Sequence, residues 1–455
     1  MHMATRLAAR TLALSLAAHA GAAVAGDSAP LADILLSPDG DHWRASYSLA
    51  QPAHALRFAR EDRQGHRVHD WTPLDEGIEL VQVDGVEVVR RKDGKPFKAF
   101  AFRMLPRYRP LEKDYAPFSP FGDGGLLIHS GRFHACPGSC DDVDEAAWRI
   151  RVSPPDGAHV IVHGEVRPAA DFVERGDGTN VYIGKSTPVD TDEVVAVVDQ
   201  TFPQAARDGL TTLFPRLMDY YRSELGALAR KPMLFASRDA NYPEGGYGFQ
   251  GGTLPDQVFM HLYGRNEAFD HADFGHRMDW FFAHEAAHLY QRPRPLASAG
   301  DTWIHEGGAD AMAALALRDL GLLSAAALAT QLDDNVDACS AGLGGKPLDT
   351  SHEAGRFDNF YSCGKLLQML IDADARRASG GLCDLWCVWR DFLARVDAGE
   401  PWSSDTFLAA AAKHVDPQTI AFTADAVHQA MDDPAPTLRA RLRAAGLAED
   451  AGGSP

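Results

Sequence analysis

The chain has 455 residues, more than one hydrophobic core usually organises, so two or three domains are expected. Hydrophobic residues make up 45% and charged residues 24%, a composition that excludes a disordered or fibrous protein. The formal net charge is −19 and no lysine or arginine run occurs, which argues against nucleic acid as a partner. No later stretch approaches the roughly 20 apolar residues of a membrane-spanning helix, so we expect no integral membrane segment.

The N-terminal residues have the layout of a signal peptide. Arg6 and Arg10 precede a short apolar run over residues 11–18, and the small residues Ala23-Val-Ala25 follow. We therefore predict a signal peptide over residues 1–25, cleavage near Ala25, and an exported product that is periplasmic or secreted.

From about Asp41 to Ile183 the sequence is a series of short alternating segments, which predicts an all-β, sandwich-like domain over residues 26–190. Asp84-Gly85 lies between two such segments. This dipeptide predicts a tight hairpin turn because both residues tolerate positive φ angles.

Beyond Thr191 the apolar spacing becomes helical, beginning with Val194, Val197 and Val198, so the domain boundary is placed near residue 190. Strand-like runs at residues 232–236 and 257–263 flank a glycine-rich stretch at 245–252, and the chain beyond Asp273 is mainly helical in pattern. The fold class predicted is a multidomain α+β protein. Its later parts are a second domain over 191–375, a helical C-terminal region over 376–449 and a disordered tail over 450–455.

The six cysteines of an exported chain predict disulfides. Spacing favours pairs within Cys136-Pro-Gly-Ser-Cys140 and between Cys383 and Cys387, which leaves Cys339 and Cys363 as a longer-range pair. A metal–thiolate site is the alternative.

The strongest chemical signal is the segment 281–290, an apolar helical pattern interrupted by His284, Glu285 and His288. Imidazoles and a carboxylate inside a buried helix are costly unless a partner compensates them. Histidines one helical turn apart share a face and can both reach one cation. Glu285 projects beside them, where it can serve as general base toward a metal-bound water.

A second helix, expected to begin at Asp301 or Thr302 after a loop containing Pro293, places Glu306 near its first turn as a third ligand. Three protein ligands with one open position form a catalytic rather than a structural zinc pattern. Asp310, one turn later, is predicted to accept a hydrogen bond from the outer nitrogen of a ligating histidine. The alternative is that Glu306 and Asp310 lie on a solvated helix face.

The glycine pair Gly307-Gly308 after Glu306 is unfavourable in a helix, by about 1 kcal/mol for each glycine relative to alanine. We interpret it as a close approach of the first helix.

These residues resemble the gluzincin zinc metallopeptidases, and among them the aminopeptidase-N-like families. Three motifs carry the resemblance: His284-Glu-Ala-Ala-His288, Trp303-Ile-His-Glu306-Gly and Tyr361-Ser-Cys-Gly364. Over roughly residues 190–375 the resemblance implies a thermolysin-like catalytic domain with one zinc ion per chain and a peptide or protein substrate. It implies the ligands His284, His288 and Glu306, the base Glu285, and Tyr361 as the group that stabilises the oxyanion.

The sequence also departs from that family. The Glu-Asn pair that grips a substrate's free amine is missing from Gly246–Gly252, His305 replaces an asparagine, and the spacing to Glu306 is one residue shorter. The primary prediction is therefore an aminopeptidase-like zinc peptidase, with a zinc endopeptidase as the first alternative.

The second alternative is a non-catalytic zinc-containing binding protein, which the presence of the base Glu285 disfavours. If the protein is an enzyme, the run 257–263 either forms the edge strand of the cleft and pairs with an extended peptide, or is an ordinary buried strand. The sequence does not predict the oligomeric state.

Overall fold

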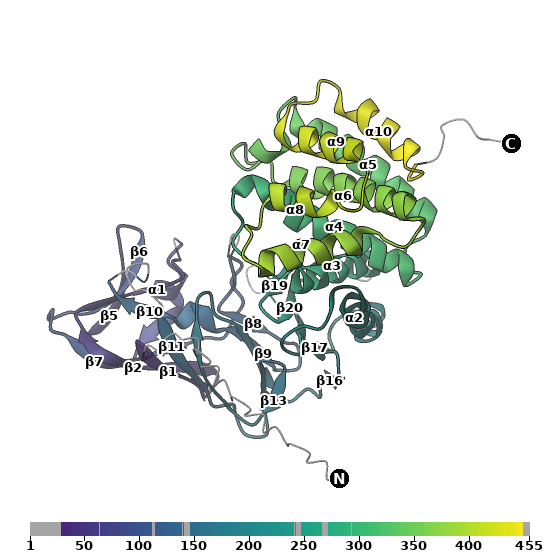
Figure 1. Cartoon of the computed structure of the whole chain (residues 1–455). Coiled ribbons are helices and arrows are strands. Elements are labelled where there is room, and N and C mark those ends of the chain that lie inside the picture. The colour runs from purple at the N-terminus through teal and green to yellow at the C-terminus, as the bar shows by residue number, and fades with distance from the viewer. Residues whose placement is uncertain are drawn as a thin grey trace, which may run out of the picture.

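The computed structural model describes residues 29–448 except 63, 112–113, 139, 141–145, 241, 243–246, 266–271 and 293. The predicted signal peptide and C-terminal tail lie outside the described residues. Strands occupy the N-terminal half of the chain and helices the C-terminal half (Figure 1). Within the described residues no helix is both long and apolar enough to cross a membrane.

The N-terminal domain contains three sheets. The first has the strand order β14-β11-β1-β2-β7-β4, the second β10-β3-β6-β5 and the third β13-β12-β15-β9-β8. Their bounds are β1 Ala32–Asp39, β2 His42–Ala53, β3 Ala55–Phe58, β4 Trp71–Pro73, β5 Ile78–Val83, β6 Val86–Arg91, β7 Phe97–Met104, β8 Phe118–Pro120, β9 Leu126–His129, β10 Ala135–Pro137, β11 Ala147–Val152, β12 His159–Val162, β13 Glu165–Arg167, β14 Ala170–Arg175 and β15 Asn180–Gly184, with a short helix α1 at His66–Asp70.

Alternating burial builds the core of this domain. In β1 every second side chain is buried, including Ile34 and Leu36, and these side chains join one apolar cluster to which all three sheets contribute. The predicted hairpin is present: Val83 of β5 pairs with Val86 of β6, and the turn has φ of 52° at Asp84 and 81° at Gly85.

A five-stranded sheet of order β16-β17-β18-β20-β19 begins the next part of the chain. Its strands are β16 Val189–Asp190, β17 Val195–Val198, β18 Met233–Asp239, β19 Tyr247–Leu254 and β20 Gln257–Gly264. The helical pattern predicted from Val194 is wrong over β17, because this valine-rich run is a mostly buried strand between β16 and β18 of a mixed sheet. Helix α2 (Gln204–Leu225) begins only after Pro203.

The second of the two possibilities for residues 257–263 is correct, because they form a buried strand, β20. β20 pairs with β18 on one side and with β19 on the other, so the glycine-rich segment forms the edge, not residues 257–263. Glycines suit this edge strand because aromatic rings pack closely against its backbone and leave no room for a Cβ atom. A Cβ on Gly248 would lie 2.5 Å from the hydroxyl of Tyr263, and one on Gly251 would lie 2.6 Å from the ring of Phe281.

The rest of the chain is helical, and β19 and β20 lie beneath its helix α3 (Figure 1). The bounds are α3 Ala272–Tyr290, α4 Thr302–Asp319, α5 Ala325–Leu343, α6 Asp358–Ser379, α7 Leu385–Asp397, α8 Ser404–Ala411, α9 Pro417–His428 and α10 Pro434–Ala444. One apolar core runs from Val194 to Leu442, and α6 crosses the predicted boundary at residue 375. The C-terminal helices therefore extend the core of the preceding domain.

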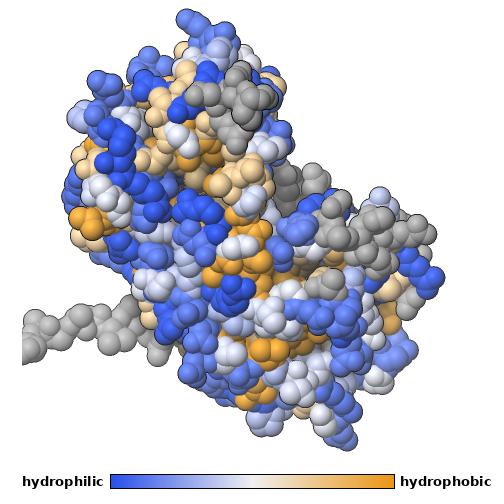
Figure 2. All heavy atoms as spheres, turned by 90° about the vertical axis from the view of Figure 1, so that its right-hand side faces the viewer, coloured by the Kyte–Doolittle hydropathy of each residue, from blue (hydrophilic) through white to orange (hydrophobic). Residues whose placement is uncertain are grey.

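The N-terminal domain packs directly against the five-stranded sheet. Phe121, Leu127 and Tyr182 of its third sheet share a buried cluster with Val197 and Phe235 of β17 and β18. On the face shown in Figure 2, hydrophilic side chains dominate and hydrophobic ones reach the surface in small patches.

The structure contains the disulfides Cys136–Cys140 and Cys339–Cys363. Cys383 and Cys387 are free thiols, so the predicted structural disulfide between them is wrong. The Cys383 sulfur is directed toward His414 and the Cys387 sulfur accepts a hydrogen bond from Arg390, which gives each thiol a partner outside the pair.

Candidate metal centre

The structure brings the three predicted ligand residues together. The Nε2 atoms of His284 and His288 are 3.0 Å apart, and Oε2 of Glu306 lies 3.4 Å from the first and 3.3 Å from the second. Within the described part of the chain, these three residues form the one group of at least three His, Cys, Asp or Glu whose ligand atoms could hold a metal ion.

The Nδ1 atoms of both histidines, which point away from Glu306, contact hydrogen-bond acceptors. Nδ1 of His284 lies 2.8 Å from Oδ1 of Asp310, and Nδ1 of His288 lies 2.7 Å from Oε1 of Gln291. The Gln291 amide is oriented by its own donation to the backbone oxygen of His305, at 2.8 Å. Because Asp310 and Gln291 present acceptors, each Nδ1 carries a hydrogen and each Nε2 of a neutral ring offers a lone pair.

Nε2 of His284, Nε2 of His288 and Oε2 of Glu306 therefore lie close together, and this group favours binding of a positive charge. Burial of His284 disfavours protonation, yet hydrogen bonds with Asp310 and Glu306 prevail and raise its pKa to about 10. The pKa of Glu306 is held well below its usual value by the two histidines, although burial opposes this. Two imidazoles and one carboxylate form the donor set of catalytic zinc sites, so these residues fit zinc.

Glu285 lies beside the ligands and contacts the edge strand. The hydroxyl of Thr253 in β19 is 2.7 Å from Oε2 of Glu285 and 2.7 Å from its backbone oxygen. The contact joins α3 to β19 and limits the rotation of the Glu285 carboxylate.

Tyr361, in the first turn of α6, reaches the site from the other side. Its ring stacks on that of His284, with centroids 5.7 Å apart and an interplanar angle of 24°. Burial and the nearby carboxylate of Glu306 raise the pKa of the Tyr361 hydroxyl above its usual value. The hydroxyl therefore stays protonated and can donate a hydrogen bond.

Two glycines allow that approach. A Cβ on Gly364 would lie 2.6 Å from the backbone oxygen of Trp303 and 2.9 Å from Cα of Gly307. A Cβ on Gly307 would lie 2.4 Å from Cα of Gly364. The close approach predicted for the glycine pair thus exists. Gly307 faces α6, which places Tyr361 over His284, whereas a Cβ on Gly308 would lie 3.1 Å from the side chain of Gln291, the residue after α3.

His305 closes the site beside His288. The two rings have centroids 4.1 Å apart, and burial together with the neighbouring His288 lowers the pKa of His305 to about 3. A neutral imidazole at this position adds no positive charge to compete with a bound cation.

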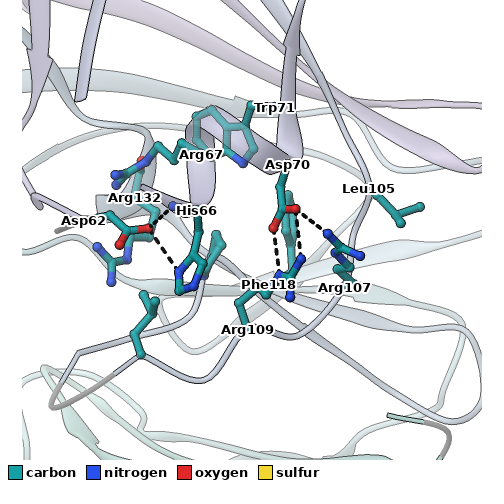
Figure 3. A pocket seen from close by; sticks show the side chains of 12 residues that line it. Asp62, His66, Arg67, Asp70, Trp71, Leu105, Arg107, Arg109, Phe118 and Arg132 are labelled. Carbon is teal, nitrogen blue, oxygen red and sulfur yellow. Dashed lines mark hydrogen bonds and ion pairs between the residues drawn. The ribbon is translucent and has the colours of Figure 1, made fainter. Parts of the chain in front are cut away.

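A second group of charged side chains lies in the N-terminal domain (Figure 3). There Asp70 pairs with Arg107 and Arg109, and His66 lies 3.2 Å from Asp62. The cavity between them has a volume of about 20 Å³, room for a water molecule and not for a substrate.

Sequence reasoning missed Gln291 and Thr253. Gln291 follows His288 by three residues, so helical spacing was a usable signal for it. Thr253 is 32 residues from Glu285 along the chain, and no local pattern connects the two.

Comparison with known proteins agrees with this architecture. No family model matches the sequence, and no curated protein matches it. Among solved structures, an aminopeptidase N family protein from Idiomarina loihiensis is similar with a TM-score of 0.63 and 12% identity, over 90% of this chain and 78% of that one. An M1 zinc metallopeptidase from Deinococcus radiodurans, in a variant bound to a Tyr-Ser-Ala substrate, has a TM-score of 0.49 and 14% identity, over 89% of this chain and 95% of that one. The first similarity shows that this chain has an aminopeptidase-N-like fold, the fold class that the motif resemblance implied.

Proposed function

We propose that this protein is a zinc-dependent peptidase that hydrolyses peptide bonds, with His284, His288 and Glu306 as ligands of one zinc ion. One observation carries the proposal. Two imidazole nitrogens and one carboxylate oxygen lie within 4.8 Å of one another, and the carboxylate of Glu285, adjacent in sequence to His284, is hydrogen-bonded by Thr253. A scaffold needs only the ligands, whereas Glu285 is needed for turnover.

When bound, zinc supplies a Lewis acid and lowers the pKa of a water molecule toward neutrality. Glu285 takes the proton from the attacking water and can pass it to the leaving amine. The Tyr361 hydroxyl donates a hydrogen bond to the oxygen on which negative charge develops. Asp310 and Gln291 keep both imidazoles in the tautomer that points Nε2 inward.

The edge strand β19 is where we propose that the peptide binds. It pairs with β20 on one side only, and Phe249, Gly251 and Thr253 point toward α3, where Phe249 packs against Phe281 with centroids 6.2 Å apart. An extended substrate can add to the other edge through backbone hydrogen bonds.

An endopeptidase is the second candidate. Among the described residues of β19, 247–254, no carboxylate is available to bind a free amino terminus. A mixed peptide library digested with and without a chelator, with cleavage positions mapped by mass spectrometry, separates the two. Release of single N-terminal residues supports the aminopeptidase, and internal cuts support the endopeptidase.

Glu285→Gln tests the catalytic proposal itself. The substitution preserves size and can keep a hydrogen bond with Thr253 but removes the base, so hydrolysis should fall at least about 10²-fold with unchanged zinc content and melting temperature. Cleavage at the rate of the unmodified protein would exclude Glu285 as the base. Absence of chelator-sensitive hydrolysis of any peptide by the unmodified protein would favour the binding-protein alternative.

We also propose that the protein acts outside the cytoplasm. The layout of residues 1–25 and the two disulfides support this, since disulfides persist mainly in oxidising compartments. N-terminal sequencing of the mature protein tests it: a start near residue 26 supports export, and an intact Met1 contradicts it.

A further inference from the structure

The free thiols of Cys383 and Cys387 lie at the start of α7, in the helical half of the molecule (Figure 1). Cys383 is next to a histidine that contacts a carboxylate. Sγ of Cys383 lies 3.2 Å from Nδ1 of His414, and Nε2 of His414 lies 2.8 Å from Oδ2 of Asp391. The order is thiol, imidazole, carboxylate, which is the arrangement that activates a nucleophile.

The carboxylate assigns the roles of the two ring nitrogens. Hydrogen bonds with His414 and Lys413 lower the pKa of Asp391 although burial opposes this, so Asp391 accepts. Nε2 of His414 must then carry the hydrogen, and Nδ1 is left as an acceptor facing the Cys383 thiol. The geometry gives Cys383 a base that is already oriented.

Cys387 completes the arrangement. It lies in the first turn of α7, four residues after Cys383, and receives a hydrogen bond from Nη2 of Arg390 at 3.3 Å. Burial and this neighbouring thiol raise the pKa of Cys383 to about 12. Cys383 therefore rests as a thiol and needs His414 to remove its proton, and its high pKa makes it a poor leaving group once it is in a disulfide.

Cys383 is accessible from a cavity of about 340 Å³, the size of a small-molecule site. The cavity is also lined by Ser379, His414, Asp416, Arg377 and Lys413, and the two cations pair with Asp374 and Asp391. The cavity therefore offers room for a small-molecule disulfide next to Cys383.

We propose that Cys383 and Cys387 form a redox-active dithiol that exchanges with the disulfides of small-molecule thiols. His414 removes the Cys383 proton, and the Cys383 sulfur attacks one sulfur of the small disulfide. The bond between its two sulfurs breaks, and the first thiol leaves with a proton. Cys387 then attacks Cys383 in the mixed disulfide, which releases the second thiol and leaves a Cys383–Cys387 disulfide. One disulfide is reduced to two thiols while two cysteines are oxidised, so atoms and electrons balance.

The test uses the full-length protein with oxidised glutathione as the probe and non-reducing peptide mapping as the readout. We expect a Cys383–Cys387 disulfide in the unmodified protein and a glutathione adduct on Cys383 in the Cys387→Ser variant. The Cys339–Cys363 disulfide should stay unchanged and serves as the internal control.

A second measurement isolates the base. In His414→Gln, alkylation of Cys383 by iodoacetamide should slow by about 10²-fold or more, whereas alkylation of Cys387 in the same sample should change little. Parallel slowing or acceleration of both thiols would mean a general structural change and would count against the assigned base. Absence of any Cys383–Cys387 disulfide or Cys383 adduct with excess oxidised glutathione would overturn the proposal.

Discussion

From the close contact between Gly364 and the backbone of α4 we predict the effect of Gly364→Ala on stability and activity. An added Cβ would lie 2.6 Å from the backbone oxygen of Trp303, about 0.8 Å short of the 3.4 Å at which ordinary contact begins. The atoms it meets belong to backbone, so no side chain can rotate away. Helices α4 and α6 must separate, and Tyr361 must move with α6.

The expected free-energy change is the difference of two effects. Overpacking of this kind costs about 1–3 kcal/mol. Alanine is better than glycine in a helix by about 1 kcal/mol, which offsets part of that cost. We predict a net loss of up to about 2 kcal/mol in the free energy of unfolding. A displacement near 1 Å at a catalytic group can lower turnover by about 10²-fold, so activity should suffer more than stability.

Urea denaturation, zinc analysis and peptide hydrolysis measure these effects. Gly275→Ala is the matched control, because Gly275 lies in α3 and a Cβ there meets no atom within 4 Å. The control should be stabilised by about 0.5–1 kcal/mol. If Gly364→Ala were as stable as Gly275→Ala and fully active, the argument that the glycine contact positions Tyr361 would fail.

Three further predictions concern the metal centre. The purified protein should contain one zinc ion per chain, and His288→Ala should reduce the zinc content sharply. Equal zinc in both proteins by elemental analysis would contradict the ligand assignment. Tyr361→Phe should lower turnover by about 10²–10³-fold because a hydrogen-bond donor to the oxyanion is lost, while KM, zinc content and melting temperature stay nearly unchanged. Near-normal turnover would show that Tyr361 is only a packing residue. Thr253→Val keeps the side-chain shape but removes the hydroxyl beside Glu285, so kcat should fall by about fivefold, given about 1 kcal/mol for one hydrogen bond. An unchanged kcat would show that Glu285 needs no such support.

Several features of the site were accessible from the sequence because helical geometry alone creates them. His284 and His288 share a face at a spacing of four residues, and Gln291 falls beside that face. The hairpin at Asp84 and Gly85 is equally local, since the backbone preferences of two residues decide it. In each case neighbours in the chain are neighbours in space.

Tertiary structure alone decided the rest. Thr253 reaches Glu285 because a glycine-rich strand lies at the sheet edge beneath α3, although its composition is unusual for a strand. Val195 begins a strand rather than a helix because an antiparallel neighbour, β16, and a parallel one, β18, flank that run, which propensity cannot foresee. Gly307 meets Gly364 of α6, whereas Gly308 lies near Gln291 after α3, since crossing positions follow from how whole helices pack. The Cys383 thiol faces His414 for the same reason. A contact between residues far apart in the chain depends on how the whole intervening segment folds, and no local sequence pattern predicts it.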